Sequence, residues 1–179
     1  SDMVLRTLND TLDAAKMENS ELKINAEPFQ PYNTLNQVVE SMSYSATKKQ
    51  LDLSYNFKGE QEATVIGDDF RIKQVLVNLL SNAIKYNNDG SVTINAELLQ
   101  GEINTLQVDV RDTGKGISAD QQANLFSKYY QTSSAKGQVG TGLGLFICKQ
   151  LVEMQDGKIS VKSSPAAGST FSFFIPYKK

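Results

Sequence analysis

The chain of 179 residues contains no histidine and only one cysteine, Cys148. Without histidine it has no imidazole for general acid–base catalysis, no histidine-based catalytic triad and no histidine-ligated zinc. A single cysteine excludes an internal disulfide and a cysteine-rich metal site, and we expect it to be a small buried side chain. Any chemistry must therefore use carboxylates, amides, lysines, backbone N–H groups or a group supplied from elsewhere.

Long apolar segments and an excess of positive charge are also missing. No apolar run approaches the roughly 20 residues that span a bilayer, and no signal-peptide pattern is present. The chain has 18 Lys and Arg against 20 Asp and Glu, for a net charge of −2, without a basic stripe. Nothing in this balance favours binding to nucleic acid. The hydrophobic content of 40% is typical of a globular domain.

Residues 68–85 (DDFRIKQVLVNLLSNAIK) are predicted to form an amphipathic helix that begins at an aspartate N-cap. The stripe expected to face the core consists of Ile72, Val75, Leu76, Leu79 and Ala83. Asn78, Asn82 and Lys85 follow the spacing i, i+4, i+7 and lie together beside that stripe. Two amides and an ammonium group suit a hard cation and a phosphate chain. The alternative is a polar helix face that only meets water.

The remaining pattern predicts an α+β fold. Further helices are expected over residues 3–19, 32–49 and 143–155, with a short one capped by Ser118 and Gln121. Strands are expected within residues 21–29, 51–57, 64–66, 91–99, 103–111, 159–162 and 168–175. Together they indicate a two-layer α/β sandwich: a mixed sheet of about five strands, covered on one face by three helices. The long polar segment 112–142 is of the kind that is usually functional.

Two glycine-rich motifs flank that polar segment. The first, DTGKGI at residues 112–117, follows an apolar strand, so Asp112 could accept from an amine such as that of adenine. Alone it could also be an ordinary turn. The second, GTGLGL at residues 140–145, opens a predicted helix, where backbone N–H groups can face an anion. Its spacing matches neither a Rossmann fingerprint nor a P-loop.

The order of the asparagine helix, DTGKGI, a long lid and GTGLGL resembles the ATP-binding catalytic domain of sensor histidine kinases. That domain belongs to the superfamily shared with gyrase, heat-shock chaperones and mismatch-repair proteins. The resemblance covers residues 21–177. It implies an ATP-binding catalytic domain over residues 21–179, an ATP lid over residues 115–139, and a remnant of a dimerisation and phosphoacceptor helix over residues 1–20.

The resemblance also assigns residues to a nucleotide site. Asn82 matches the Mg²⁺ ligand, Asn78 its companion one turn earlier, and Lys85 and Tyr86 the pair that lines the phosphate and nucleoside region. The other residues that it places against ATP are Asp112, Gly114, Gly116, Ile117, Tyr130, Gly140, Thr141, Gly142, Leu143, Gly144, Leu145 and Thr170. No catalytic residue is certain, and the candidates are Asn78, Lys85, Lys128 and Gln131.

The implied function is transfer of the γ-phosphoryl of ATP, with Mg²⁺, to a histidine on a dimerisation domain that this chain lacks. A response regulator receiver domain would be the onward partner. The fragment is expected to be a monomer from a homodimeric parent, in the cytoplasm; whether that parent is anchored in a membrane stays open.

Two positions bear on the alternatives. ATP-hydrolysing branches of the superfamily carry a glutamate general base where this chain has Asn78, and an amide cannot take a proton. Gln131 stands where many histidine kinases carry an arginine, so Lys128 or Lys136 could supply the charge instead. The other readings are an ATPase or serine kinase of the same superfamily, and a non-catalytic nucleotide-sensing or scaffold module.

Overall fold

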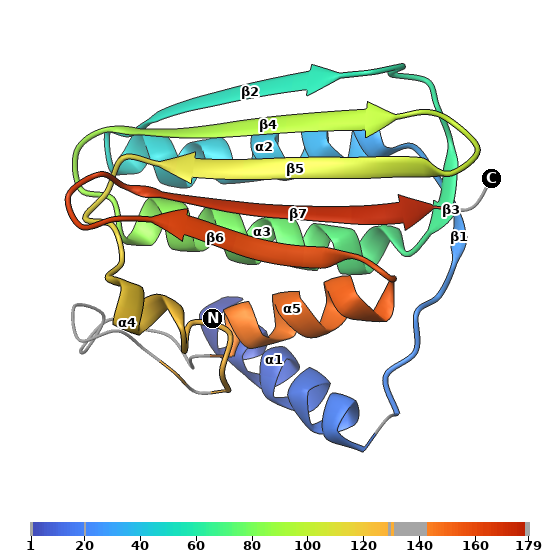
Figure 1. Ribbon diagram of the computed structural model, residues 1–179, viewed down its shortest axis with the longest axis horizontal. Helices are drawn as coiled ribbons and strands as arrows, with labels where there is room; N and C mark the ends of the chain where they lie inside the picture. The colour runs from blue at the N-terminus through green and yellow to red at the C-terminus, as the bar shows by residue number, and fades with distance from the viewer. Residues whose placement is uncertain (1, 20, 129, 131–142, 178–179) are drawn as a thin grey trace.

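The computed structural model describes residues 2–19, 21–128, 130 and 143–177. Within them a five-stranded mixed sheet has the strand order β2-β4-β5-β7-β6 (Figure 1). Its strands are β2 (Asp52–Lys58), β4 (Ser91–Leu99), β5 (Asn104–Asp112), β7 (Ser169–Tyr177) and β6 (Lys158–Ser163). Strand β2 runs parallel to β4, and the other neighbours are antiparallel. The predicted mixed sheet is confirmed.

Three helices cover one face of this sheet: α2 (Pro31–Lys48), α3 (Asp69–Lys85) and α5 (Gly144–Met154) (Figure 1). Alternate residues of each central strand point to these helices and are buried, as a half-buried sheet requires; examples are Ile94, Val108 and Phe173. The five residues predicted for the inner stripe of α3 are at most 5% exposed. The two-layer sandwich is therefore confirmed, and Cys148 is buried in its core as expected.

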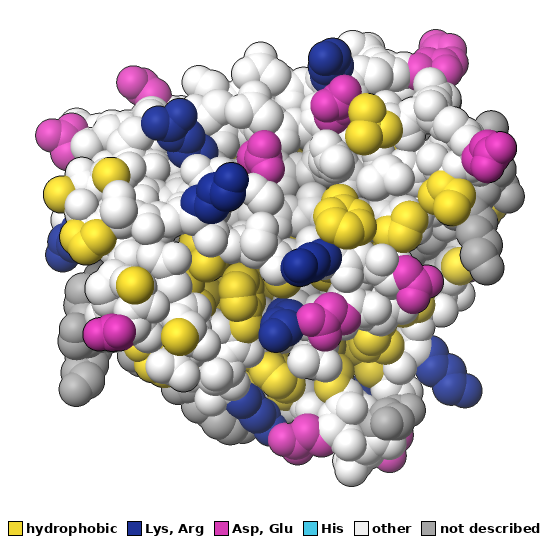
Figure 2. Space-filling view, viewed as in Figure 1, with side chains coloured by type: hydrophobic (Ala, Val, Ile, Leu, Met, Phe, Trp, Pro, Cys, Tyr) yellow, Lys and Arg dark blue, Asp and Glu magenta, His cyan; other side chains and the backbone are white. Residues whose placement is uncertain are grey.

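No helix covers the opposite face of the sheet in the part of the chain that the structure describes. In Figure 2, which looks onto this face, Lys, Arg, Asp and Glu side chains are interspersed with hydrophobic ones among other polar side chains and backbone. This mixture keeps the uncovered face compatible with water. None of the described helices is long and apolar enough to cross a membrane.

A second, two-stranded sheet was not anticipated. Strands β1 (Glu27–Phe29) and β3 (Val65–Gly67) pair antiparallel. The prediction of strand alternation from residue 22 was wrong, because residues 21–26 form no strand and β3 is too short to pair with more than three residues. Gly67 is needed here, since a Cβ at this position would overlap the ring of Tyr177. That ring also packs edge-on against Phe29, with the ring centroids 5.7 Å apart.

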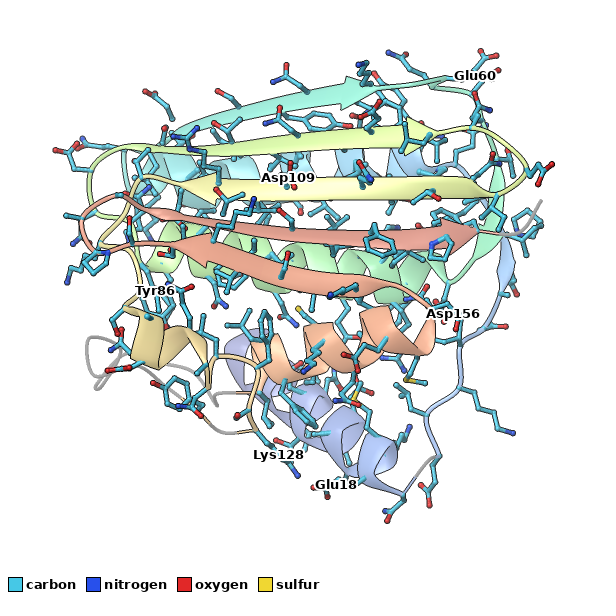
Figure 3. All side chains as sticks on the ribbon, viewed as in Figure 1. Glu18, Glu60, Tyr86, Asp109, Lys128 and Asp156 are labelled. Atoms are coloured by element: carbon cyan, nitrogen blue, oxygen red, sulfur yellow. The ribbon has the colours of Figure 1, made fainter. Side chains whose placement is uncertain are left out.

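Two further helices were predicted close to where they occur. Helix α1 (Asp2–Glu18) packs against α5 and buries Ala14. Helix α4 (Ala119–Gln122) starts with the expected capping box of Ser118 and Gln121. At the end of α1, Glu18 forms an ion pair with Lys128 (Figure 3). Lys128 lies within the predicted lid, so the described part of that lid is tied to the N-terminal helix.

Candidate functional site

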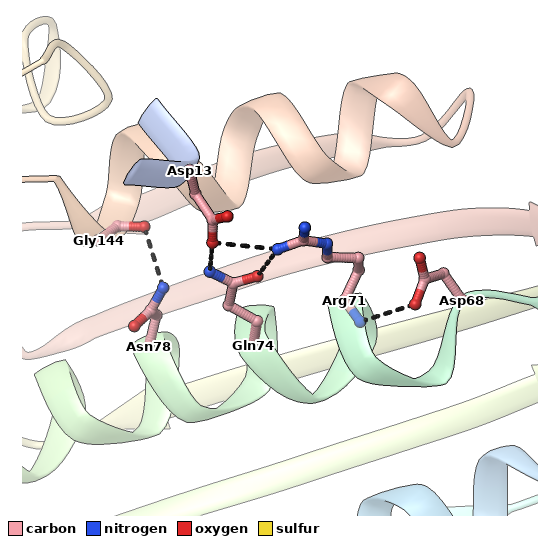
Figure 4. Close-up of polar contacts among 6 residues, drawn as sticks. All are labelled: Asp13, Asp68, Arg71, Gln74, Asn78 and Gly144. Atoms are coloured by element: carbon pink, nitrogen blue, oxygen red, sulfur yellow. Dashed lines mark hydrogen bonds and ion pairs between the residues drawn. The ribbon is translucent and has the colours of Figure 1, made fainter. Parts of the chain in front are cut away.

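The polar face of α3 meets the first turn of α5. The Asn78 side chain is buried, and its Nδ2 donates to the carbonyl oxygen of Gly144 at 3.4 Å (Figure 4). Asn82 follows one turn later and is half-buried. At the end of the helix, the ammonium of Lys85 lies 5.1 Å from the ring centroid of Tyr86. The structure therefore places Asn78 at the start of α5, which lies within the segment 140–145 that was expected to bind an anion.

Asp112 ends β5 with its carboxylate buried. Its Oδ1 accepts a hydrogen bond from the backbone N–H of Gly114 at 2.9 Å. Burial raises the pKa of Asp112, and the backbone N–H groups of Gly114 and Ser169 offset part of that rise. The geometry gives a partly desolvated carboxylate in a fixed orientation, which is a good acceptor for an amine donor.

The two glycines of DTGKGI are required by packing. A Cβ on Gly114 would lie 2.7 Å from the carbonyl oxygen of Tyr86 and 3.1 Å from Asp112 Oδ1. Gly116 adopts a φ of +74°, and a Cβ there would overlap the carbonyl oxygen of Ser164. The loop is therefore pressed between the end of α3 and the turn after β6, which joins Asp112 to the polar face of α3 in one site.

Residues that sequence reasoning missed hold this loop in place. Ser163 Oγ accepts from the backbone N–H of Ile117 at 2.8 Å and lies 2.7 Å from Ser169 Oγ. Gln122 Nε2 donates to the carbonyl oxygens of Ile117 and Ser163 at 2.7 and 2.9 Å. No local motif marks Ser163, because the pairing of β6 with β7, and of β7 with β5, is what brings it to the loop that follows Asp112.

Thr170 and its neighbour Ser169 lie on opposite faces of the sheet. In the sheet register Asp112 pairs with Ser169, whereas Thr170 pairs with Arg111 and Lys162. Because side chains alternate along a strand, the buried Ser169 is on the helix-covered side with Asp112, and Thr170 is on the uncovered side. Both residues line a pocket of about 300 Å³ at the strand ends. A contact of Thr170 with nucleotide stays a prediction.

The structure describes some of the other predicted site residues and leaves out the rest. Lys128 is paired with Glu18, and Tyr130 packs against the core. Leu143 is fully buried, while Leu145 is half-buried. The predicted residues outside the described part of the chain are Gln131, Lys136, Gly140, Thr141 and Gly142.

Residues 67–179 match the family model described as histidine kinase-, DNA gyrase B-, and HSP90-like ATPase. The matched segment contains α3, the Asp112 loop, α5 and all of the main sheet except β2. The chain belongs to this ATPase family. The family and fold that the motifs suggested are confirmed.

Curated relatives of this ATPase domain are histidine kinases. Histidine kinase 5 of Arabidopsis thaliana is 39% identical over 99% of the chain, and RcsC of Escherichia coli K12 is 37% identical over 98%. BarA of the same strain is 39% identical over 96%. The chain spans only 22%, 18% and 19% of these three proteins, so it corresponds to one part of much longer molecules.

Solved structures agree with this assignment. Full-length ShkA in complex with AMPPNP superposes with a TM-score of 0.85 at 28% identity, over 99% of this chain and 36% of that one. The catalytic domain of the histidine kinase ThkA gives a TM-score of 0.73 at 28% identity, over 86% of this chain and 97% of that one. Histidine kinase catalytic domains therefore share the architecture seen here.

Proposed function

We propose that this domain binds ATP with Mg²⁺ and donates the γ-phosphoryl group to a histidine on a dimerisation domain of the same parent protein. The observation that carries the proposal is the buried carboxylate of Asp112, held by Gly114 against the end of α3. It can supply an acceptor for the exocyclic amine of adenine beside the end of α3, the helix that carries Asn78, Asn82 and Lys85. Asp112 would bind the base, and the polar residues of α3 would bind the phosphate chain.

The donor set also fits a nucleotide-bound magnesium ion. No group of three or more His, Cys, Asp or Glu residues that could hold a metal occurs among the described residues. Mg²⁺ needs no such cage, because it takes few protein oxygens and completes its shell with phosphate and water. The amide oxygen of Asn82 would be the protein ligand. When bound, the ion neutralises charge on the phosphates.

Asn78 favours phosphoryl transfer over hydrolysis. Its amide cannot remove a proton from water, and Nδ2 already donates to Gly144. The phosphoryl group is therefore preserved for a better nucleophile. Because the chain has no histidine, that nucleophile must come from a separate domain. The proposal extends to a homodimeric cytoplasmic parent that passes the phosphoryl group to a response regulator receiver domain.

Calorimetric titration with a non-hydrolysable ATP analogue tests the first half of the proposal. We expect the wild-type chain to bind more tightly with Mg²⁺ than without it. Asp112→Asn should lose most of the affinity, and Asn82→Ala should lose the Mg²⁺ dependence. Radiolabelled ATP and a separately supplied histidine-bearing dimerisation domain test transfer. Binding without any transfer to that histidine would contradict the kinase assignment, and no binding would contradict the site itself.

A further inference from the structure

The last turn of α3 carries Asn82 and Lys85, and Tyr86 caps it. From the backbone, the N–H group of Asn87 donates to the carbonyl oxygen of Ile84 over a long 3.4 Å. The C-cap residue of α2 adds a shorter hydrogen bond. Lys49 Nζ donates to the carbonyl oxygen of Ile84 at 2.8 Å and to that of Lys85 at 3.1 Å. A cation at this end also opposes the negative pole of the helix dipole.

The backbone at Lys49 is held by the hydrogen bonds that end α2. It is the C-cap residue of α2, which ends in a Schellman motif: Gln50 N donates to Thr47 O, and Leu51 N donates to Ala46 O, both at 2.9 Å. Gln50 adopts the left-handed conformation that the motif needs, with a φ of 59°. The position of the Lys49 backbone, and so the direction from which its side chain reaches α3, is therefore determined by the end of α2.

The turn that Lys49 holds leads directly into the site. The carbonyl oxygen of Tyr86 is the atom against which Gly114 packs. Asn87, which is buried, donates from Nδ2 to the carbonyl oxygen of Ser91 at 3.0 Å. Thr113 Oγ1 in turn accepts from Ser91 N at 3.0 Å. Movement of the end of α3 would thus shift both Lys85 and the loop that orients Asp112.

We infer that Lys49 is a positioning residue for nucleotide binding, although it lies outside every motif that points to the nucleotide. This inference rests on the proposed function. Lys49 acts by fixing the last turn of α3, and through it the distance between the phosphate-side residues and the Asp112 loop. Two of the three N–H donors of its ammonium bind carbonyl groups of the protein, so we assign it a positioning role and not a contact with phosphate.

Lys48 provides a matched control. It is the neighbouring lysine, it is exposed, and its side chain makes no hydrogen bond or ion pair within the part of the chain that the structure describes. Lys49→Met keeps the length of the side chain and removes the charge and the donor. Lys49→Arg keeps both, and Lys48→Met makes the same chemical change without loss of a contact.

The four proteins should be titrated with the same ATP analogue and Mg²⁺, well below their melting temperatures. We expect Lys49→Met to raise Kd about tenfold, Lys48→Met to change it less than about twofold, and Lys49→Arg to restore most of the affinity. Amide hydrogen exchange at Tyr86, whose N–H donates to Asn82 O at 3.0 Å, should accelerate in Lys49→Met alone.

If Lys49→Met binds the analogue as tightly as wild type, even with a lower melting temperature, then Lys49 only stabilises the end of α3 and does not position the site. That result would overturn the inference. An equal loss in Lys48→Met would reduce the effect to surface charge and overturn it as well. Failure of the wild-type chain to bind the analogue would instead refute the proposed function, and the inference with it. That result is distinct, because it appears before any variant is compared.

Discussion

Helix α1 is joined to α3 through the carboxylate of Asp13. Its Oδ2 accepts from Arg71 Nη1 at 3.0 Å and from Gln74 Nε2 at 2.8 Å, and Arg71 Nη1 also donates to Gln74 Oε1 at 2.8 Å (Figure 4). The side chains of Arg71 and Asp13 are 13% and 14% exposed. The pair is therefore largely out of water and only weakly screened by salt.

We expect Asp13→Ala to cost about 2 kcal/mol of the free energy that holds α1 in place. Removal of one partner from a buried ion pair costs about 3–5 kcal/mol. A smaller value applies here because Arg71 keeps Gln74 Oε1 as an acceptor and some access to water. Since α1 rests on α5 and this network and adds no strand to the sheet, the loss should appear as local opening. Amide exchange within α1 should accelerate about thirtyfold.

Lys16→Gln is the control, because Lys16 is exposed on the same helix and its side chain has no polar partner in the described chain. It should leave exchange in α1 unchanged. A double-mutant cycle of Asp13→Asn and Arg71→Gln should give a coupling energy of about 1–2 kcal/mol. Additive effects of the two substitutions, together with wild-type exchange in both single variants, would refute the assigned interaction.

Three further predictions concern the site. Asn78→Glu should raise ATP hydrolysis, measured by phosphate release, while the Kd of the analogue, measured by calorimetry, stays within about threefold of wild type. Loss of analogue binding in this variant would contradict the prediction. Gly114→Ala should weaken nucleotide binding at least about tenfold, because its Cβ would press on the carbonyl oxygen of Tyr86. Gly101→Ala should have no effect in the same titration, because its Cβ would make only an ordinary contact, 3.7 Å from the carbonyl oxygen of Ile103. The raised pKa of Asp112 means that its contribution to stability is largest when it is protonated, and falls as pH rises from the ordinary carboxyl range through the raised value. Affinity for adenosine, which has no phosphates to titrate, should show the opposite trend: it should decrease as pH falls and the Asp112 carboxylate becomes protonated. Asp112→Asn should remove this pH dependence.

Much of the fold follows from short-range patterns. Val92 and Ile94 alternate with polar neighbours on β4, and the sheet buries them as the pattern predicts. The N-cap of α3 was also predictable, since Asp68 Oδ1 accepts from Arg71 N at 3.2 Å. Such features depend on residues within one or two turns of each other, where periodicity and capping chemistry decide the structure.

Contacts between distant segments were harder to foresee. Strands β1 and β3 are three residues each, too short for a visible alternation. The link from Asp13 to Arg71 joins residues 58 positions apart, and neither residue belongs to a motif. The same holds for Lys49 and Ile84, which are 35 positions apart. Polar pairs of this kind depend on how helices pack, and the hydrophobic pattern of a single helix does not specify its polar partners.

The residues of the site also fall into those with a local sequence signal and those that only distant contacts reveal. One residue of the second kind could still have been placed from the sequence. Asp112 and the asparagines of α3 carry local signals, whereas Ser163 becomes recognisable only after β6 pairs with β7. Ser169 is different. Phe171, Phe173 and Ile175 place large apolar side chains at every second position, which predicts that this set faces the helices, and the residue two positions before Phe171 shares their side. Alternation alone therefore places Ser169 with Asp112 and turns Thr170 to the uncovered face. The motif resemblance identifies the turn, and the alternation of side chains along the strand decides which of its hydroxyl groups shares a face with Asp112.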